Sequence, residues 1–506
     1  MKSDPETSRF PNQSELVNMD LLAALPDELL FDLFRSLDVV SFLSLSRANR
    51  HLHDVSQDCR LLQNAERRTR SVLHYALDLR SSFLITGPGG VGKSYTLSKL
   101  HQAATERNLR IAMTAPTGIA ATNLTCGRTI HSYSRLGLAK ISLADIQMCF
   151  QTRTGQWYKW QDIWLNTDIL VIDEISMLGA SLFEKVELCA RLARGGGAPF
   201  GGMQVILCGD FFQLPPVEDR FVFTSPIWSF LALPIVPLTT PVRQRGDLQW
   251  FNLLNRIRIG SVVSDDITLL SSRVSRLDMV DILSGEYGCM LVSTNKEAST
   301  YNTIAFDCNP HDIVHQAHAQ DSIFENILEG DYFRRVPRPD LVPASYQDRI
   351  ERRLIKIPSL VELKHGAVYA ITFNIDTDAG LVNGKMCRFD ATEGERGRMV
   401  SLTGEVLPDY ILNPIDREVY IAGKLFFLRR QIPFRLGHAL TIHSSQGMTL
   451  SEAVVDCGCN IFTSAQTYVA LSRVERLEGL TLTDLDPTKI KANSEAVTFY
   501  EALGLM

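Results

Sequence analysis

The stretch from Gly87 to Ser94 holds the residues with the most specific chemical pattern in this chain. It reads GPGGVGKS, which matches the spacing G-x-x-x-x-G-K-[ST] of a phosphate-binding loop. An apolar run at 83–86 precedes the loop and a helical pattern follows it, so a strand, a glycine-rich turn and a helix are expected in that order. Backbone N–H groups of such a loop converge on phosphate oxygens, and the helix N-terminus favours negative charge. The context therefore favours a phosphate site over an ordinary glycine-rich turn.

Two side chains at the end of the loop indicate a nucleotide that is bound with a metal ion. Lys93 is placed to reach the β- and γ-phosphates, and the Ser94 hydroxyl is placed to ligate Mg²⁺. The predicted cofactors are therefore ATP and Mg²⁺. The loop residues expected to bind the nucleotide are Gly87, Pro88, Gly89, Gly90, Val91, Gly92, Lys93 and Ser94.

Acidic, amide and basic side chains further along the chain complete a candidate site for nucleotide hydrolysis. Asp173 directly follows an apolar run and is predicted to hold Mg²⁺, while Glu174 is predicted to polarise the attacking water. Gln213 follows the next apolar run and is expected to orient water or contact the γ-phosphate, with an ordinary loop amide as the alternative. Arg243 and Arg473 are candidate arginine fingers, which neutralise charge on the transferred phosphoryl group. Surface salt bridges are the alternative for both.

The totals narrow the class of protein. With 506 residues, of which 45% are hydrophobic, several domains with substantial cores are expected. The net charge of −6 gives no support for a nucleic-acid partner, so any basic track must be local. The ten cysteines form no C-x-x-C pair, which favours reduced, intracellular thiols. No apolar run approaches about 18 residues and the N-terminus is polar, so neither a membrane span nor a signal peptide is expected.

Hydrophobic patterning divides the chain into a helical start, two α/β parts and a β-rich part. Residues 1–20 are predicted to be a disordered tail, and residues 21–66 a separate all-α segment. The second α/β part is expected to begin near residue 238 and to contain the β-rich part as an insertion. The predicted strands are 169–172 and 205–208 in the first part, 290–293 and 453–456 in the second, and 368–373 and 424–428 in the insertion.

Nine motifs in a fixed order give the chain a resemblance to a known family. Together they resemble the PIF-type DNA helicases, the 5′-to-3′ branch of superfamily one, over residues 83–485. Each motif alone is weak, whereas the combination is highly specific. The motifs are GPGGVGKS (87–94), APTGIAA (115–121), GRTIHSYSRLG (127–137), DEISML (173–178), PFGGMQVILCGDFFQLPPV (199–217), RQ (243–244), STN (293–295), QIPFRLGHALTIHSSQGMTL (431–450) and YVALSRV (468–474).

The resemblance implies a fold and a set of domains. The implied fold class is α/β, with two RecA-like P-loop NTPase domains that sandwich ATP. A small β-barrel-like insertion, an accessory domain of the Src-homology-three type, would help to grip single strands. The domains are expected at 67–237 for the first RecA-like domain, which includes a small wedge insertion at about 131–165, at 238–358 and 438–506 for the second, and at 359–437 for the β insertion.

The resemblance also implies roles for individual residues. Arg243 and Arg473 would reach the nucleotide from the second domain. Short hydroxyl, imidazole and backbone N–H groups suit DNA phosphates because they bind any base sequence. Capped turns and core imidazoles stay open as alternatives for the hydroxyl-bearing and histidine residues among them. The residues that match DNA-contacting segments are Pro116, Thr117, Gly118, His131, Ser132, Thr441, His443, Ser445, Gln446 and Gly447.

Three positions depart from the family pattern. The family usually has a Glu-Gln pair before the phosphate loop, where the glutamine reads adenine, and this pair is missing around residues 67–70. Ser444 stands where a lysine is frequent, and His438 stands where an aromatic residue is frequent. The missing pair affects the expected preference for adenine. Ser444 removes one expected phosphate contact, and His438 affects the expected stacking on a base.

Residues 25–58 raise a second resemblance, to the F-box. This small helical module docks on the Skp adaptor of cullin–RING ubiquitin ligases. A proline at a helix start, leucines at helical spacing and the later sequence Ser-Arg-x-Asn-Arg agree with it. An amphipathic helical cap on the helicase is the alternative. The implied adaptor-binding face consists of Leu25, Pro26, Leu29, Phe34 and Leu37.

The expected function is that of an ATP-driven DNA helicase that moves 5′ to 3′ on single-stranded DNA during replication, repair, recombination or telomere maintenance. The expected partners are single-stranded and forked DNA and the Skp adaptor, the expected state is a monomer, and the expected location is the nucleus. Two alternatives stay open. The first is an F-box substrate receptor whose helicase body recognises targets or DNA, and the second is a P-loop ATPase that remodels protein or RNA.

Overall fold

The computed structural model describes most of the chain after residue 63. The predicted tail and the F-box-like face lie outside the described residues, so Leu25, Pro26, Leu29, Phe34 and Leu37 have no structural account. The described residues are 64–136, 141–153, 161–275, 289–329, 332–338 and 358–506, apart from 374, 377–378, 380, 382–384, 392–396, 403 and 423–424.

The first lobe, within residues 64–237, is built on a six-stranded parallel sheet in the order β3-β2-β4-β5-β1-β6. Its central strands β1, β4 and β5 are buried at every residue, as the apolar runs of a sheet covered on both faces require. The two strands predicted for this part are confirmed as β4 and β5. The strands are β1 (Phe83–Thr86), β2 (Ile111–Ala115), β3 (Arg128–Thr129), β4 (Ile169–Ile172), β5 (Gln204–Gly209) and β6 (Ile235–Pro237).

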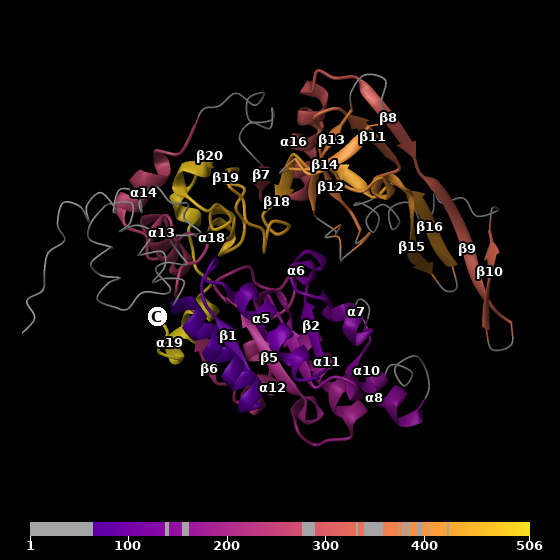
Figure 1. Ribbon diagram of the computed structural model, residues 1–506, viewed down its shortest axis with the longest axis vertical. Coiled ribbons are helices and arrows are strands. Elements are labelled where there is room, and N and C mark those ends of the chain that lie inside the picture. Colours follow the sequence, from indigo (N-terminus) through magenta and orange to yellow (C-terminus); the bar gives the residue numbers. More distant parts are fainter. Residues whose placement is uncertain are drawn as a thin grey trace, which may run out of the picture.

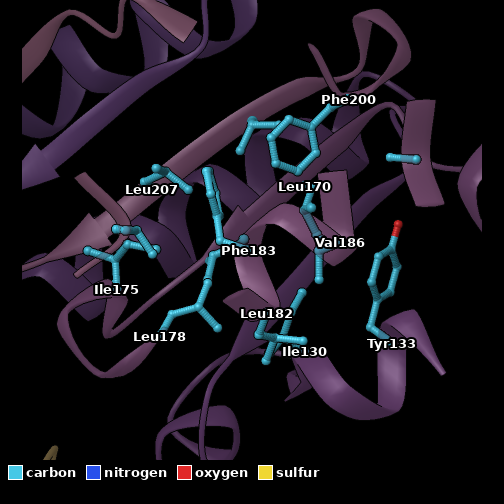
Figure 2. Packing of buried hydrophobic residues seen from close by; sticks show 14 of the residues in the cluster. Ile130, Tyr133, Leu170, Ile175, Leu178, Leu182, Phe183, Val186, Phe200 and Leu207 are labelled. Carbon is cyan, nitrogen blue, oxygen red and sulfur yellow. The ribbon is translucent and has the colours of Figure 1, made fainter. Parts of the chain in front are cut away.

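Helices cover this sheet and enclose an apolar core. Phe183 and Val186 of α11 pack with Leu170 and Leu207 of the sheet, and the ring of Phe183 lies 5.5 Å from that of Phe200 (Figure 2). Among the described residues, no helix combines the length and the apolarity needed to cross a bilayer. The helices are η1 (His74–Asp78), α5 (Lys93–Glu106), α6 (Gly118–Thr122), α7 (Ile130–Ser134), α8 (Leu143–Thr152), α10 (Gln161–Leu165), η2 (Ile175–Met177), α11 (Ala180–Arg194), η3 (Pro199–Gly202), η4 (Val222–Thr224) and α12 (Pro226–Leu231).

The second lobe, within residues 248–308 and 437–490, has a four-stranded parallel sheet in the order β18-β7-β19-β20. Both strands predicted for it are confirmed, as β7 and β19. Its elements are α13 (Leu248–Ile259), α14 (Ser264–Ser271), β7 (Cys289–Val292), α16 (Asn295–Cys308), β18 (Ala439–Thr441), β19 (Ala453–Cys457), α18 (Gln466–Leu471), η7 (Leu477–Gly479), β20 (Leu480–Leu485) and η8 (Pro487–Lys489).

A β-rich region interrupts the second lobe and is longer than the sequence predicts. It starts at residue 313 rather than 359, because β8 pairs with β11 and β9 pairs with β16. Most residues of β8 are exposed, so its sequence lacks the apolar alternation that would have marked it. Antiparallel sheets of this region extend to one side (Figure 1). The elements are β8 (Ile313–His318), β9 (Gln320–Glu329), β10 (Tyr332–Pro337), β11 (Leu360–Lys364), β12 (Val368–Ile371), β13 (Met386–Asp390), β14 (Arg398–Ser401), η6 (Asp409–Leu412), β15 (Ile415–Ala422), β16 (Leu425–Gln431) and β17 (Phe434–Leu436).

The last helix returns to the first lobe. α19 (Ser494–Ala502) lies beside β1 and β6 rather than against the sheet of the second lobe that precedes it (Figure 1). Ala496 and Tyr500 are part of the apolar core of the first lobe, although the sequence predictions place the C-terminus in the second domain. The second lobe and its β-rich insertion thus leave the first lobe after β6 and lead back to it through α19.

Phe183→Ala tests the core of the first lobe. We expect the variant to lose about 3–5 kcal/mol of unfolding free energy, because a buried ring is removed and its neighbours close the cavity only in part. The measurement is denaturant unfolding of the purified protein. The control is Phe230→Ala, whose side chain is 74% exposed and should contribute less than about 0.5 kcal/mol. Equal losses from the two variants would contradict the assigned core.

Candidate active site between the two parallel sheets

The phosphate loop forms where β1 ends and α5 begins, as its sequence predicts. Gly90 and Gly92 adopt positive φ of +83°, a conformation that favours glycine. A Cβ on Gly90 would lie 2.8 Å from Cβ of Arg243, so the segment after the first lobe packs tightly on this turn. The Lys93 ammonium donates to the carbonyls of Gly87 and Pro88, at 2.7 and 2.8 Å. Its charge is therefore held over the loop where phosphates would lie.

A cavity of about 290 Å³ opens beside this loop and lies between the lobes. The first lobe contributes the loop with Lys93 and Ser94, and also Glu174 and Gln213. The second lobe contributes Gly447, Thr449, Arg473 and Glu475. Residues from six separated motifs therefore meet at one cavity. Its lining is Gly89, Gly90, Gly92, Lys93, Ser94, Tyr95, Glu174, Gln213, Val242, Arg243, Gly447, Thr449, Arg473 and Glu475.

The two carboxylates after β4 have different surroundings. Asp173 is only 5% exposed, and burial, followed by the charge of Glu174, raises the pKa of Asp173 to about 6. One of its oxygens accepts from the backbone N–H of Glu174 at 2.9 Å. Glu174 has a φ of +49° and lines the cavity, whereas Asp173 lies behind it. Oxygen donors from Ser94 and Asp173 suit Mg²⁺, which proteins usually bind through one or two carboxylates, substrate phosphates and water.

The two candidate arginine fingers both reach the cavity, from different positions. The backbone N–H of Arg243 donates to the Gly90 carbonyl at 2.9 Å, so this residue lies on the phosphate loop rather than across from it. Its guanidinium donates to the Ser472 carbonyl at 2.8 Å. Arg473 is 2% exposed and donates to the Val469 carbonyl at 2.8 Å. Burial, followed by the charge of Arg473, lowers the pKa of Arg243 to about 10.

Gln446 joins the lobes directly at the catalytic residues. Its side-chain nitrogen donates to Glu174 at 3.0 Å and to Gln213 at 3.2 Å. Gln446 is 3% exposed, so it offers little surface to a DNA backbone. Nearby, the side chain of Asn123 donates to the Gly447 carbonyl at 3.4 Å. The Gln446 side chain thus makes a contact between the lobes, and its contact with DNA stays a prediction.

The predicted DNA-binding residues of the first lobe lie at the starts of two short helices. Thr117 caps α6 by accepting from the N–H of Ala120 at 3.2 Å, while Pro116 and Gly118 beside it are half-buried. Ser132 is exposed at the start of α7, where its N–H donates to Thr129. The capped-turn alternative therefore applies to Thr117. Burial lowers the pKa of His131, which favours a neutral imidazole there.

The second group of predicted DNA-binding residues is largely buried: Thr441, Ser445 and Gln446 are buried, and His443 and Gly447 are half-buried. Thr441 pairs with Ser444 through their hydroxyls at 2.8 Å, and both lie at the end of β18. Ser445 is fully buried and donates to the Ile442 carbonyl, and its contact with DNA stays a prediction. His443 is half-buried, and burial lowers its pKa. Its ring lies parallel to that of Phe462, at 6.2 Å.

His438, which stands at the position of a frequent aromatic residue, has a structural role here. Its Nε2 accepts from the backbone N–H of Val368 at 3.0 Å. Burial, followed by the charge of Arg388, lowers the pKa of His438 to about 4, so the ring is neutral. Phe462 of the second lobe lies outside the motifs. It is 64% exposed and offers an aromatic face.

Tyr468 was also missed as a site residue, although it opens the last motif. The N–H of Gly89 in the phosphate loop donates to the Tyr468 hydroxyl at 2.8 Å. Tyr468 is buried, and burial raises its pKa to about 12, so it is a neutral phenol. The motif contained the signal, but the partner of the hydroxyl depends on how the lobes meet.

A second cavity of about 220 Å³ continues from the phosphate loop toward the residues before β1. It lies where a base attached to a nucleotide in the loop would extend. Thr69 and Thr96 pair there at 3.1 Å, and Arg68 donates to the Pro237 carbonyl at 2.7 Å. The lining is Ala65, Glu66, Arg68, Thr69, Val91, Gly92, Tyr95, Thr96, Leu238, Thr240 and Val242, with hydroxyl and charged groups in place of the missing glutamine.

Comparisons with known sequences find similar proteins over most of this chain. Residues 66–264 match the family model described as PIF1-like helicase. The chain is 32% identical to the ATP-dependent DNA helicases PIF1 of Mus musculus, over 446 residues, and of Homo sapiens, over 432 residues. These matches cover 86% and 83% of this chain, and 62% and 61% of the relatives. The chain thus spans about three fifths of the length of these relatives.

Comparisons with solved structures agree with the fold. The crystal structure of the Pif1 helicase from Candida albicans matches with a TM-score of 0.71 and 28% identity, covering 86% of this chain and 98% of that one. The Bacteroides Pif1 bound to single-stranded DNA matches with a TM-score of 0.62 at 23% identity, which shows a shared fold alone. The resemblance to PIF-type helicases and the predicted pair of α/β, RecA-like lobes are confirmed.

Gln446→Glu tests the contact between the lobes. The new carboxylate would lie against Glu174, and such like-charge pairs cost several kcal/mol. We expect the melting temperature at pH 8 to fall by at least about 4 °C. Lowering the pH toward 5 should recover most of the loss, because two carboxylates that share a site raise the pKa of one of them, which then takes up a proton.

Gln102→Glu is the matched control, since Gln102 is exposed on α5. It should change the melting temperature by less than about 2 °C at either pH, as surface substitutions usually do. A drop in Gln446→Glu that did not depend on pH would contradict the proximity of the two carboxylates.

Proposed function

We propose that this chain is an ATP-dependent DNA helicase of the PIF1 type, which couples hydrolysis between its lobes to movement along single-stranded DNA. The observation that carries the proposal is the cavity that joins the phosphate loop, Glu174 and Gln213 of the first lobe to Arg473 of the second. A nucleotide in this cavity would contact both lobes, so its cleavage would change how they meet. The mouse and human relatives are named ATP-dependent DNA helicases, which supports the assignment.

In this proposal the first lobe binds and activates the nucleotide. Lys93 exchanges its two carbonyl partners for the β- and γ-phosphates, which carry far more negative charge. Ser94 and Asp173 hold Mg²⁺, which neutralises charge on the phosphates. Glu174 lies in the cavity and accepts the proton of the attacking water, while Gln213 orients that water by donating and accepting at once.

Arg243, which lies on the phosphate loop, and Arg473 of the second lobe stabilise the charge that develops on the transferred phosphoryl group. Arg243 and Arg473 are both largely desolvated, and burial lowers the pKa of each, so an anion between them would gain strongly from their charges. The donors of Arg473 point to carbonyl and hydroxyl oxygens rather than to carboxylates. Nucleotide phosphates can replace those neutral partners at small cost.

We propose that single-stranded and forked DNA bind across both lobes. The exposed or half-buried candidates Thr117, Ser132 and His443 lie at helix starts and after a strand end, where hydroxyl and N–H groups suit phosphates of any sequence, and Thr441 is a buried candidate near His443. The β-rich region would act as the accessory, barrel-like domain that grips the strand. We also propose that the protein acts as a monomer in the nucleus, with the residue roles given above.

The unwinding of tailed duplexes tests the proposal. We expect ATP-dependent unwinding of a duplex with a 5′ tail and little unwinding of one with a 3′ tail, because the family resemblance implies 5′-to-3′ movement. Lys93→Ala should reduce DNA-stimulated ATPase activity and unwinding at least about 100-fold, since a preorganised cation at the phosphates is lost. Strand separation on gels and phosphate release are the two measurements.

Lys99→Ala is the matched control, because Lys99 is an exposed lysine on the same helix. It should retain activity within about twofold. Turnover retained by Lys93→Ala would contradict the nucleotide site. Stimulation by RNA but not by DNA would favour the alternative of an RNA-remodelling ATPase.

A second candidate function rests on the F-box-like sequence at 25–58, which has a proline at a helix start followed by leucines at helical spacing. In this proposal the segment docks on the Skp adaptor, and the helicase body presents DNA-bound targets to a ubiquitin ligase. We expect purified Skp adaptor to co-purify with the full chain, and replacement of Pro26 and Leu29 by alanine to lower recovery about tenfold or more, as loss of central apolar anchors does.

Replacement of the exposed Leu503 by alanine, at the other end of the chain, is the control and should leave adaptor recovery unchanged. Equal recovery from the wild type and the Pro26 and Leu29 variant would reduce the segment to a helical cap. The ATPase prediction does not depend on this outcome.

A further inference from the structure

A buried ion pair joins the first lobe to α13 behind the nucleotide cavity. Arg258 donates to both oxygens of Asp210, each at 2.7 Å. The Asp210 side chain is completely buried and that of Arg258 is 12% exposed. Asp210 lies directly after β5, while α13 packs with the core of the second lobe. The pair therefore ties one strand end of the first lobe to a helix of the second.

The C-terminal helix adds a third element to this cluster through Tyr500. The Tyr500 hydroxyl accepts from the backbone N–H of Phe211 at 3.2 Å and lies 2.6 Å from the Thr86 hydroxyl. It also lies 3.5 Å from a carboxylate oxygen of Asp210. The Tyr500 ring stacks on Phe212 at 4.9 Å, on the same side as the Arg258 guanidinium. One phenol thus contacts two neighbouring strand ends.

Both of these strand ends lead directly into the nucleotide site. Thr86 is the last residue of β1, and the phosphate loop begins at the next residue. Asp210 begins the turn that places Gln213, because the N–H of Gln213 donates to the Asp210 carbonyl at 2.9 Å. The N–H of Phe212 donates to the Asp210 carboxylate at 3.2 Å. The geometry of this turn therefore depends on acceptors supplied by Asp210 and Tyr500.

We propose that Tyr500 is a positioning residue for nucleotide hydrolysis, which acts through the Asp210–Gln213 turn on the placement of the Gln213 amide. The inference rests on the proposed function, since it assigns Gln213 to the hydrolytic step. Without the phenol oxygen, the buried N–H of Phe211 loses its acceptor, and the turn must shift to satisfy it. A displacement of Gln213 of less than 1 Å is enough to slow a reaction that depends on an oriented water.

The role assigned to Tyr500 also implies that α19, the last helix, contributes to nucleotide hydrolysis. α19 contacts the first lobe through Phe499 as well, whose ring stacks on Phe223 at 4.4 Å. Because α19 follows the second lobe in the chain, a change in how the lobes meet would act on the turn through this helix. Asn493 caps its first turn by accepting from the N–H groups of Glu495 and Ala496.

Tyr500→Phe tests the inference, since it removes the hydroxyl and keeps the ring. We expect kcat of the DNA-stimulated ATPase to fall about tenfold while KM for ATP changes less than about twofold, because the phosphate contacts stay in place. The deciding measurement is a double-mutant cycle with Gln213→Ala. In the Gln213→Ala background, Tyr500→Phe should change kcat by less than about twofold, because both changes then affect the same step.

Hydrogen exchange supplies a second readout that does not need turnover. Amides of 210–214 should exchange faster in Tyr500→Phe than in the wild type. The control is Tyr369→Phe in the β-rich region, which removes another buried hydroxyl with two hydrogen bonds. This control should alter neither kcat nor exchange at 210–214.

The outcomes separate the inference from the proposed function. An inactive wild type would contradict the helicase assignment itself. An active wild type with an unchanged Tyr500→Phe variant would overturn the positioning role. Equal reductions by Tyr500→Phe in the wild-type and Gln213→Ala backgrounds would also overturn it, because the hydroxyl would then act elsewhere than through Gln213.

Discussion

The contact of Gln446 with Glu174 and Gln213 is the interaction on which the organisation of this protein depends. One amide nitrogen of the second lobe donates to two groups of the first, at 3.0 and 3.2 Å. Both acceptors line the nucleotide cavity, so the position of the second lobe is sensed where hydrolysis would occur. A buried amide between polar partners is held strongly, because breaking the contact leaves unsatisfied groups in a low dielectric. This makes it suited to a junction with two defined arrangements.

The parallel sheet explains why distant residues meet at this junction. In the first lobe β4, β5 and β1 are adjacent, with all their carboxyl ends at one edge. Asp173, Gln213 and Lys93 follow these three ends and therefore gather there, as ligands do in open α/β sheets. The second lobe presents its own strand ends and α18 to the same edge, which brings Arg473 and Tyr468 to the phosphate loop. The cluster of Asp210, Arg258 and Tyr500 lies behind this edge and stabilises it.

The site was largely predictable where it depends on local sequence, and less so where it depends on how the lobes pack. The phosphate loop, the strands at 169–172 and 205–208 and the catalytic candidates around the cavity all follow from short motifs with regular periodicity. Motif membership did not separate exposed residues from buried ones. Thr441, Ser445 and Gln446 are buried, whereas His443 beside them is half-buried. The β-rich region began earlier than predicted because its first strand, β8, is largely exposed and lacks a buried apolar face.

Local sequence is enough to specify the phosphate loop, because that loop needs only neighbouring residues: a strand, glycines that allow positive φ, a lysine and a helix start. The groups that complete the site come together only when distant segments pack. The hydroxyls of Thr86 and Tyr500 are 414 positions apart in the chain yet 2.6 Å apart in space. No local pattern encodes such a pair, since it follows from the packing of α19 on the first lobe. Long-range burial, rather than motif spacing, thus selects the partners of the reactive groups.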